Sequence, residues 1–314
     1  MSAVFATLAF FGNQSRADDL TFETIRLPPL RIQGQAARAH TQGLELVAGM
    51  YYVTARREDV HPRRALLLRV DPAGTDWDVW DITPMDAQGV VSALDHPGGM
   101  QSDGRRLWIP LAESRRGGRS LIRVFPMAGM IPGQQLKAEF EFPVNDHVGA
   151  VAVDKKLGVV YGASWDTESV YVWSFAGLSK QTLSGTELES RGLGVVKGDN
   201  GRAGLAVQDW KVSEDCLFAS GLYRGHGIVG ESPQSRLMCF AGFPESGFKR
   251  WSILLPKQNG IELAREAMVI SGGLVHFLPE DLGASNRIFR VSFPEVMKRI
   301  VPQDSRARGK ELLR

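Results

Sequence analysis

SLIRVFPMAG, at residues 120–129, is an apolar segment that ends in a turn bearing proline and glycine. A short apolar run bounded by Pro and Gly favours a β-strand followed by a chain reversal. The same pattern recurs along the sequence, at residues 65–74 (ALLLRVDPAG), 169–177 (SVYVWSFAG), 235–242 (SRLMCFAG) and 286–294 (NRIFRVSFP). A unit repeated at intervals of roughly 50 residues is typical of the blades of a β-propeller.

Up to three further strands complete each repeat. In the second unit, another apolar strand at residues 107–110 precedes the repeated segment, a tight turn at 102–105 precedes that strand, and Gly99 lies before the turn. Glycine suits an innermost strand, because inner strands crowd together at a propeller axis. Outermost strands are expected at residues 77–80, 138–142 and 249–254, with a weak version near Leu183.

The fifth unit has no outermost strand of its own after Pro294. A spare strand, residues 22–27, lies at the other end of the chain, and an N-terminal strand that completes the last blade removes both sheet edges. We therefore predict an all-β fold, a single five-bladed β-propeller over residues 18–300 that its N-terminal strand closes. Six blades are the alternative, if residues 86–95 or 186–200 contain an extra strand.

Both ends of the chain carry their own signals. Residues 3–11 are largely apolar but too short to span a bilayer, and Ser15 and Ala17 follow with the spacing of a signal-peptide cleavage site. We predict a signal segment over residues 1–17 and a periplasmic or secreted protein, although no Lys or Arg precedes Phe11; an apolar N-terminus on a cytosolic protein is the alternative. The polar, basic residues 301–314 are expected to form a surface tail.

Composition narrows the class of partner. The chain has 314 residues, 43% of them hydrophobic, which excludes wholesale disorder, and its formal net charge of +2 argues against a nucleic-acid partner. The expected top-face loops show little sign of a large apolar patch, so we expect a small-molecule ligand rather than a protein partner, no transmembrane segment, and a monomer. Cys216 and Cys239 are expected on neighbouring strands of the fourth blade, as two buried thiols rather than a disulfide.

The blade rhythm, with segments such as DHVGAVAVD at residues 146–154, resembles that of secreted bacterial β-propeller proteins of a broad group without assigned function. It is more distantly similar to the lactonase and strictosidine-synthase-like propellers. The resemblance covers nearly the whole chain and implies a fold rather than an activity, because unrelated functions share that fold. Lactonase-type propellers typically have six blades and use acidic and amide metal ligands, so their ligand set does not transfer to this chain.

Three of the six histidines stand where successive innermost strands begin, at His40, His96 and His147. His96 and His147 also share the local frame Asp-His-x-Gly. Equivalent positions of a closed ring converge on its axis, and neutral imidazole is a common metal ligand. We predict that the three histidines bind one divalent metal ion of unassigned identity, or the reacting part of a ligand. The alternative is that they only cap strand ends through hydrogen bonds.

Other candidate residues meet the histidines on one face. The entries to the innermost strands and the loops between second and third strands lie on this face, which we name the top face. Its predicted ligand-binding residues are Gln42, Asp146, Trp165, Asp166, Tyr223, Arg224, His226 and Glu266. The pair Arg56 and Arg57 suits an anionic ligand, although such charges are more often solvated.

The top-face loops also carry carboxylates and serines. A glycosidase pair is possible among Asp59, Glu113, Asp166, Glu266 and Asp281, against the simpler interpretation of a solvated polar rim. Ser114 has no base assigned by sequence, and neither a Gly-x-Ser-x-Gly elbow nor a metal-spaced cysteine set is present, so no catalytic residue is assigned. Two functions remain: a metal-assisted hydrolase or lyase acting on an ester or lactone-like substrate, and a non-catalytic propeller that binds a ligand or a partner protein.

Overall fold

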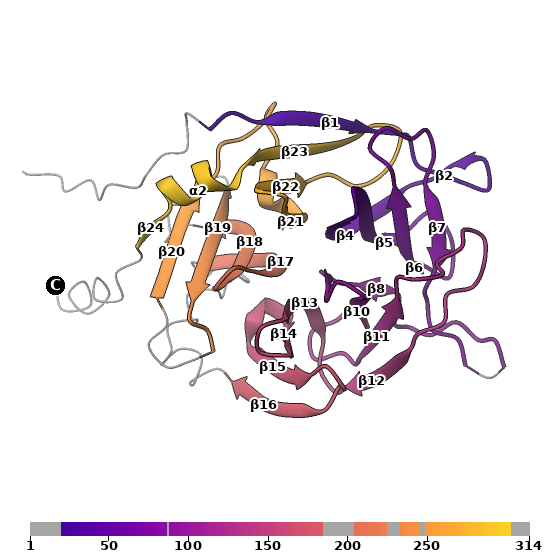
Figure 1. The fold of residues 1–314 in the computed structure, drawn as a ribbon. Helices are drawn as coiled ribbons and strands as arrows, with labels where there is room; N and C mark the ends of the chain where they lie inside the picture. Colours follow the sequence, from indigo (N-terminus) through magenta and orange to yellow (C-terminus); the bar gives the residue numbers. More distant parts are fainter. Residues whose placement is uncertain (1–19, 87, 185–203, 225–232, 245–248, 303–314) are drawn as a thin grey trace, which may run out of the picture.

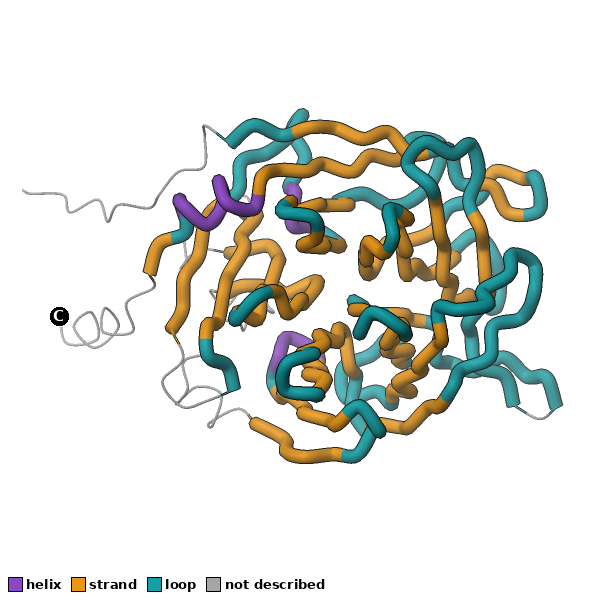
Figure 2. The backbone as a smooth tube through the Cα atoms, viewed as in Figure 1, coloured by secondary structure: helices purple, strands orange, loops and turns teal. Residues whose placement is uncertain are grey.

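The described residues of the computed structural model, 20–86, 88–184, 204–224, 233–244 and 249–302, form five small antiparallel sheets arranged as blades around a central axis (Figure 1). The tube view shows strands in every blade, joined by turns and by some longer loops (Figure 2). The predicted five-bladed propeller is confirmed. Of the two ranges named for an extra strand, the described part of residues 86–95 contributes only an isolated bridge between Met85 and Val91. Residues 186–200 lie outside the described residues.

The strands of each blade follow one another from the axis outward. Blade 1 contains β4 (Ala39–Val47), β5 (Met50–Arg57), β6 (Arg64–Val70) and β7 (Asp78–Asp81). Blade 2 contains β8 (His96–Pro97) and β9 (Gln101–Ser102), which share the innermost position, then β10 (Arg106–Ala112), β11 (Ser120–Pro126) and β12 (Phe140–Val144). Blade 3 contains β13 (Val148–Asp154), β14 (Val159–Ser164), β15 (Ser169–Ser174) and β16 (Ser179–Ser184). Blade 4 contains β17 (Gly204–Ser213), β18 (Cys216–Arg224), β19 (Gln234–Ala241) and β20 (Lys249–Leu254).

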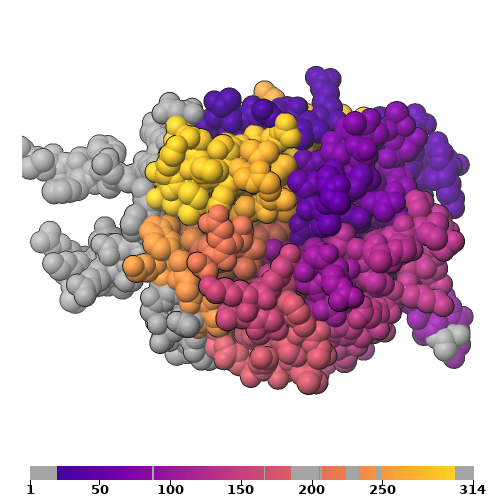
Figure 3. Space-filling model, in the orientation of Figure 1, coloured from indigo at the N-terminus to yellow at the C-terminus, as the bar shows by residue number. Residues whose placement is uncertain are grey.

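Blade 5 closes the ring in the predicted way. It contains β21 (Ala267–Ser271), β22 (Leu274–Leu278) and β23 (Asn286–Ser292), and its outermost strand is the N-terminal β1 (Glu23–Leu27). The register of β1 against β23 runs from Glu23 opposite Arg290 to Leu27 opposite Asn286. The space-filling view shows the consequence, since the yellow C-terminal sector lies directly against the indigo N-terminal one (Figure 3).

Small elements extend this scheme at its ends. A hairpin of β2 (Arg31–Ile32) and β3 (Gln35–Ala36) follows β1, and helix α2 (Phe293–Arg299) follows β23. The strand β24 (Val301–Pro302) then pairs with β20 at the outer edge of blade 4. The predicted signal segment, residues 1–17, and the rest of the predicted tail, 303–314, lie outside the described residues. No described helix is both long enough and apolar enough to cross a membrane.

Glycines allow the innermost strands to approach one another at the axis. The amide of Gly99 donates to the carbonyl of Gly149, and the amide of Val151 donates back to the carbonyl of Gly99, both at 2.9 Å. A β-carbon at Gly98 would lie 2.1 Å from the Gly149 oxygen, and one at Gly99 would lie 2.3 Å from Oδ1 of Asp209. Blades 2 and 3 therefore make a backbone contact that a side chain would block.

Buried polar side chains connect the blades along the axis. Asp209 and Lys211, 0% and 1% exposed, form an ion pair of 2.6 Å. The Asp209 carboxylate also accepts from the amides of Trp210 and Met268, at 2.9 and 3.1 Å, which joins blade 4 to blade 5. Burial raises the pKa of Asp209 to about 6, against the opposing effect of Lys211. Because a buried charge is costly unless it is paired, this part of the axis depends on the whole set of bonds.

Apolar clusters fill the spaces between neighbouring blades. Trp80, Trp108 and Trp210 are almost completely buried and belong to three different clusters. Burying a large aromatic side chain stabilises a fold by roughly 2–3 kcal/mol. The interblade packing thus supplies the stability, and the axial bonds fix how the blades meet.

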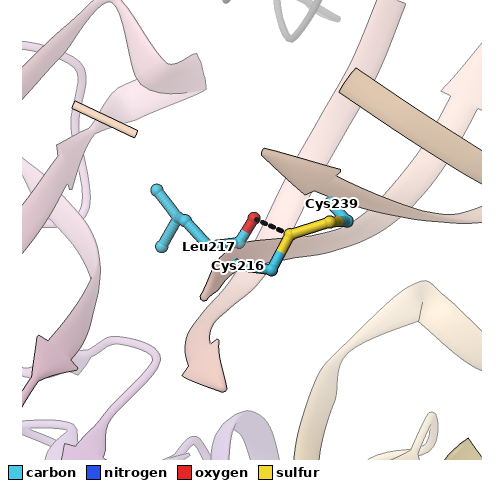
Figure 4. The surroundings of a disulfide bond; sticks show 3 residues. All are labelled: Cys216, Leu217 and Cys239. Carbon is cyan, nitrogen blue, oxygen red and sulfur yellow. Dashed lines mark hydrogen bonds between the residues drawn. A yellow bond between two sulfur atoms is a disulfide. The ribbon is translucent and has the colours of Figure 1, made fainter. Parts of the chain in front are cut away.

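The structure corrects the expectation of two free thiols in blade 4. Cys216 and Cys239 lie on the neighbouring strands β18 and β19, as predicted, but they form a disulfide (Figure 4). In the register of these strands Cys216 lies opposite Ala241, so Cys239 is diagonal to it by two residues. The Cα–Cα distance of 5.7 Å falls in the usual disulfide range, so the strand spacing that we expected to strain a bridge accommodates one.

We predict that Gly98→Ala destabilises the protein by about 3 kcal/mol, because the new methyl group would collide with backbone rather than with a movable side chain. Urea unfolding at equilibrium measures this change. Gly283→Ala is the matched control, since a β-carbon there meets no atom within 4 Å. Equal stability of the two variants would contradict the close approach of blades 2 and 3.

Reduction should raise the intact mass of the protein by two hydrogens, because the Cys216–Cys239 disulfide then opens. We expect the reduced protein to lose about 3 kcal/mol of its free energy of unfolding, the usual effect of cross-linking a loop of this size. The double variant Cys216→Ser/Cys239→Ser should show the same loss and no response to reductant. An unchanged mass would instead show that Cys216 and Cys239 are two free thiols.

Candidate functional site

The candidate site lies on the top face, where innermost strands begin and second strands end. Tight turns at the opposite ends of these strands, such as Ala48–Gly49 with positive φ at both residues, leave the top free for longer loops. The site side chains come from four blades: His40 and Arg56 from blade 1, His96 and Ser114 from blade 2, His147 and Trp165 from blade 3, and Glu266 and Asp281 from blade 5.

His40, Glu266 and Asp281 form one compact group, which we name the carboxylate–histidine group. Nδ1 of His40 lies 2.6 Å from Oδ1 of Asp281, and one ligand atom from each residue lies within 4.8 Å of the other two. The hydrogen bond to Asp281 raises the pKa of His40, and the same bond lowers the pKa of Asp281. Glu266 is only 6% exposed, and burial raises its pKa to about 7.

Arg56 organises a second group of side chains. One of its terminal nitrogens donates to Nδ1 of His96 and to Oγ of Ser114, both at 2.8 Å, while Glu58 accepts from the rest of the guanidinium. Burial lowers the pKa of His96 to about 3, with the charge of Arg56 as the next cause. His96 is therefore a neutral imidazole over the physiological pH range.

His147 joins this second group through its ring. Its Nδ1 lies 2.8 Å from the carbonyl oxygen of Glu113, and its ring centre is 5.5 Å from that of His96. Trp165, the first residue of the short 3₁₀ turn η1 (Trp165–Thr167), packs edge to face against His147 at 4.6 Å. Burial lowers the pKa of His147, which is 3% exposed. This imidazole is also held neutral.

Electrostatic interactions connect the two groups. The charge of Arg56 acts on both His40 and His96, and His40 acts on His96. The three histidines predicted from sequence therefore lie at one end of the axis, with His96 and His147 in ring contact and His40 beside the two carboxylates. A cavity of about 280 Å³ borders His40 and Asp281, with Arg38, Ala39, Glu58 and Asp59 as its other lining residues.

Other predicted ligand-binding residues have different surroundings. Asp146 accepts from the amide of His147 and from the hydroxyl of Tyr171, so its carboxylate supports the strand entry. The Tyr223 ring is covered by the Arg236 guanidinium at 3.6 Å. Gln42 lies half-buried at a bulge of β4. The side chains of Asp166 and Arg224, and the whole of His226, lie outside the described part of the chain.

Two site residues were predicted only as members of larger groups: Arg56 in an arginine pair and Asp281 among the top-face carboxylates. Asp281 and Arg56 both lie in or near loops that follow second strands, where no local frame repeats from blade to blade. Each approaches its histidine from a neighbouring blade, at sequence separations of 241 and 40 residues. Only closure of the ring and blade packing bring them together, so no local pattern identifies them.

Residues 31–229 match the sequence profile of a family of unknown function (DUF6454). No curated protein matches the sequence. The family match and the propeller fold together confirm the predicted relationship to propellers without assigned function. No comparison bears on the predicted secretion or on the predicted lactonase or strictosidine-synthase-like resemblance.

Solved structures with a similar fold are numerous and distant. A bifunctional GH43-CE protein of Bacteroides eggerthii has a TM-score of 0.50 and 9% identity over 82% of this chain and 34% of its own, so this chain spans about a third of it. A luciferin-regenerating enzyme (TM-score 0.44, 9% identity) is matched over 87% of this chain and 95% of that one, and a nidogen/laminin complex (0.43, 14%) over 82% and 85%. Likeness at this level shows the fold alone.

We predict that Arg56→Met raises the pKa of His96 above its value of about 3, because a neighbouring positive charge disappears while the burial remains. Titration of the imidazole carbon-bound protons by NMR measures the change. Arg105→Met, at the hairpin turn on the opposite face, is the matched control and should leave His96 unchanged. An unaltered or lower pKa of His96 in the Arg56→Met variant would show that the guanidinium does not lie beside this imidazole.

Proposed function

Because the chain belongs to this family of unknown function (DUF6454), we propose its function from the top face alone. The protein binds a small molecule over the axis and cleaves an ester- or lactone-like group in it. It acts as a hydrolase or lyase that is assisted by one divalent metal ion. The carboxylate–histidine group is the proposed metal site. The observation that carries this proposal is the convergence of one ligand atom from each of His40, Glu266 and Asp281 within 4.8 Å.

The donor set suits a transition ion such as Zn²⁺. One imidazole nitrogen with two carboxylate oxygens is a mixed set, whereas Ca²⁺ and Mg²⁺ prefer oxygen alone. This assignment differs from the sequence prediction of three imidazoles. His96 uses the lone pair of Nδ1 to accept from Arg56, and its neighbour is a fixed positive charge, which opposes a cation at that nitrogen.

The buried Glu266 carboxyl adds support. Its pKa is raised because burial disfavours the ionised form. The nearby His40 and Arg265, the latter 3.4 Å away, lower this pKa but do not offset the effect of burial. A bound cation would compensate that charge, and oxygen ligands of metals are commonly placed in this way. Asp281 and His40 already hold each other in orientation through their 2.6 Å bond, so two of the three groups are preorganised.

The remaining side chains suit polar chemistry at this position. A divalent ion supplies a polarised carbonyl and an activated water molecule when bound. The Arg56 guanidinium, fixed by Glu58 and Ser114, keeps a positive charge at the site wall, where negative charge on a reacting ester oxygen would be stabilised. The cavity beside His40 and Asp281 gives the ligand room to enter.

We predict that ZnCl2 or MnCl2 raises the melting temperature of protein first stripped with EDTA, since an ion that binds only the folded state stabilises it by about 2.7 kcal/mol at a hundred times its Kd. His40→Ala and Glu266→Gln should lose this increase. His61→Ala, which changes an exposed histidine of a blade 1 loop, is the control and should retain it.

Turnover is then tested with the metal-loaded protein on p-nitrophenyl acetate and γ-butyrolactone. We expect cleavage that Glu266→Gln abolishes and His61→Ala leaves intact. A melting temperature unaffected by metal would refute the metal site. Metal binding without turnover of any ester or lactone would favour the non-catalytic alternative, a propeller that only binds its ligand.

A further inference from the structure

The protonated nitrogen of His96 is determined by its partner. Arginine carries only hydrogen-bond donors, so Nδ1 of His96 must accept the 2.8 Å bond from Arg56. A neutral imidazole has one N–H, which is then on Nε2. His96 therefore presents a donor, and not a lone pair, at the far end of its ring.

The partner of His147 determines the opposite state. The carbonyl oxygen of Glu113 can only accept, so Nδ1 of His147 carries the proton of their 2.8 Å bond. Since burial keeps this imidazole neutral, Nε2 carries a lone pair. His147 presents an acceptor where His96 presents a donor.

The two rings lie side by side at the top of the axis. Their centres are 5.5 Å apart and their planes are inclined by 52°. Trp165 packs against His147 and is itself only partly buried, so an indole surface borders the pair. A donor, an acceptor and an aromatic surface are thus grouped within one small region.

We propose that His96 and His147 bind a hydroxyl group of the ligand, as a matched donor and acceptor, and that the ligand is a hydroxylated ring lying beside Trp165. A hydroxyl donates and accepts at once, so it satisfies both imidazoles. A carboxylate would leave the His147 lone pair unpaired, and an ammonium group would leave the His96 N–H unpaired; an unpaired polar group in a buried site is costly. The apolar face of a hydroxylated ring suits an indole surface.

A hydroxylated ring is thus the substrate class that we assign to the proposed function. Only its cleavage rests on that function; its recognition by the two histidines does not. The tautomers are tested directly by ¹⁵N NMR of uniformly labelled, metal-free full-length protein near pH 7, with His96→Gln and His147→Gln used to assign the signals. We expect His96 protonated on Nε2 and His147 protonated on Nδ1. Any other pair of states would overturn the proposal, whether or not a metal binds elsewhere.

Ligand recognition is tested with two lactones of the same ring size, D-ribono-1,4-lactone and γ-butyrolactone, which differ in their hydroxyl groups. We expect only the hydroxylated lactone to shift the Nε2 signals of His96 and His147, in metal-free and in zinc-loaded protein. His147→Phe should weaken its binding about tenfold, the effect of one lost hydrogen bond near the upper end of its usual range. His61→Phe is the matched control and should bind normally.

The possible failures can be told apart. Shifts by the hydroxylated lactone without metal binding or turnover would support this inference and refute the metal-assisted reaction. Equal shifts by both lactones, or none by either, would refute hydroxyl recognition even if metal-dependent cleavage is observed. Should His147→Phe fail to fold, the comparison of the two lactones on the unaltered protein still decides.

Discussion

Pairing of β1 with β23 is the constraint on which the rest of the structure depends. It completes blade 5, and blade 5 then meets blade 1 across a seam. Reciprocal backbone bonds between Ala39 and Leu282, at 3.1 and 2.9 Å, hold this seam at the top face. His40 and Asp281 lie immediately beside these two residues, so their 2.6 Å contact is part of the seam itself. The proposed metal site consequently exists only in a closed ring.

The axis sets a second requirement, that polar groups be buried without loss of their partners. Glu45 and Gln101 show how this is met. One oxygen of Glu45 accepts from the amide of Ser102 in blade 2, and Oε1 of Gln101 accepts from the amides of Val153 in blade 3 and Val212 in blade 4. These directional bonds therefore register blade 1 against blade 2, and blade 2 against both blade 3 and blade 4. Apolar packing alone would leave the blades freer to slide, since it has no preferred direction.

The repeated units were sufficient to predict five blades and the closing strand, because each blade repeats the same apolar and turn pattern. The weak outer strand near Leu183 was recovered as β16 for the same reason. The disulfide was misjudged because the distance between Cys216 and Cys239 depends on a diagonal of the strand register, which spacing in the sequence does not give. Helix α2 follows the last repeated strand and has no counterpart among the described residues of the other units.

The candidate site was predictable only in part. Equivalent positions brought His96 and His147 together as the repeat suggested, and placed His40 at the same end of the axis. The acceptor on His96 and the donor on His147 depend on Arg56 and on one backbone carbonyl, neither of which belongs to a repeated frame. The direction of each hydrogen bond follows from three-dimensional contacts, and residue type alone does not predict it.

Closure also has a consequence for when the proposed metal site forms. The strands β1 and β23 are separated by nearly the whole chain, and contacts between such distant segments form slowly, because the entropy of closing the intervening chain must be lost first. During synthesis, His40 emerges long before Glu266 and Asp281. In a nascent chain His40 thus lacks its two partner carboxylates, and the three proposed ligands come together only at the last stage of folding. Metal would then bind the closed ring and not the partly folded chain that precedes it.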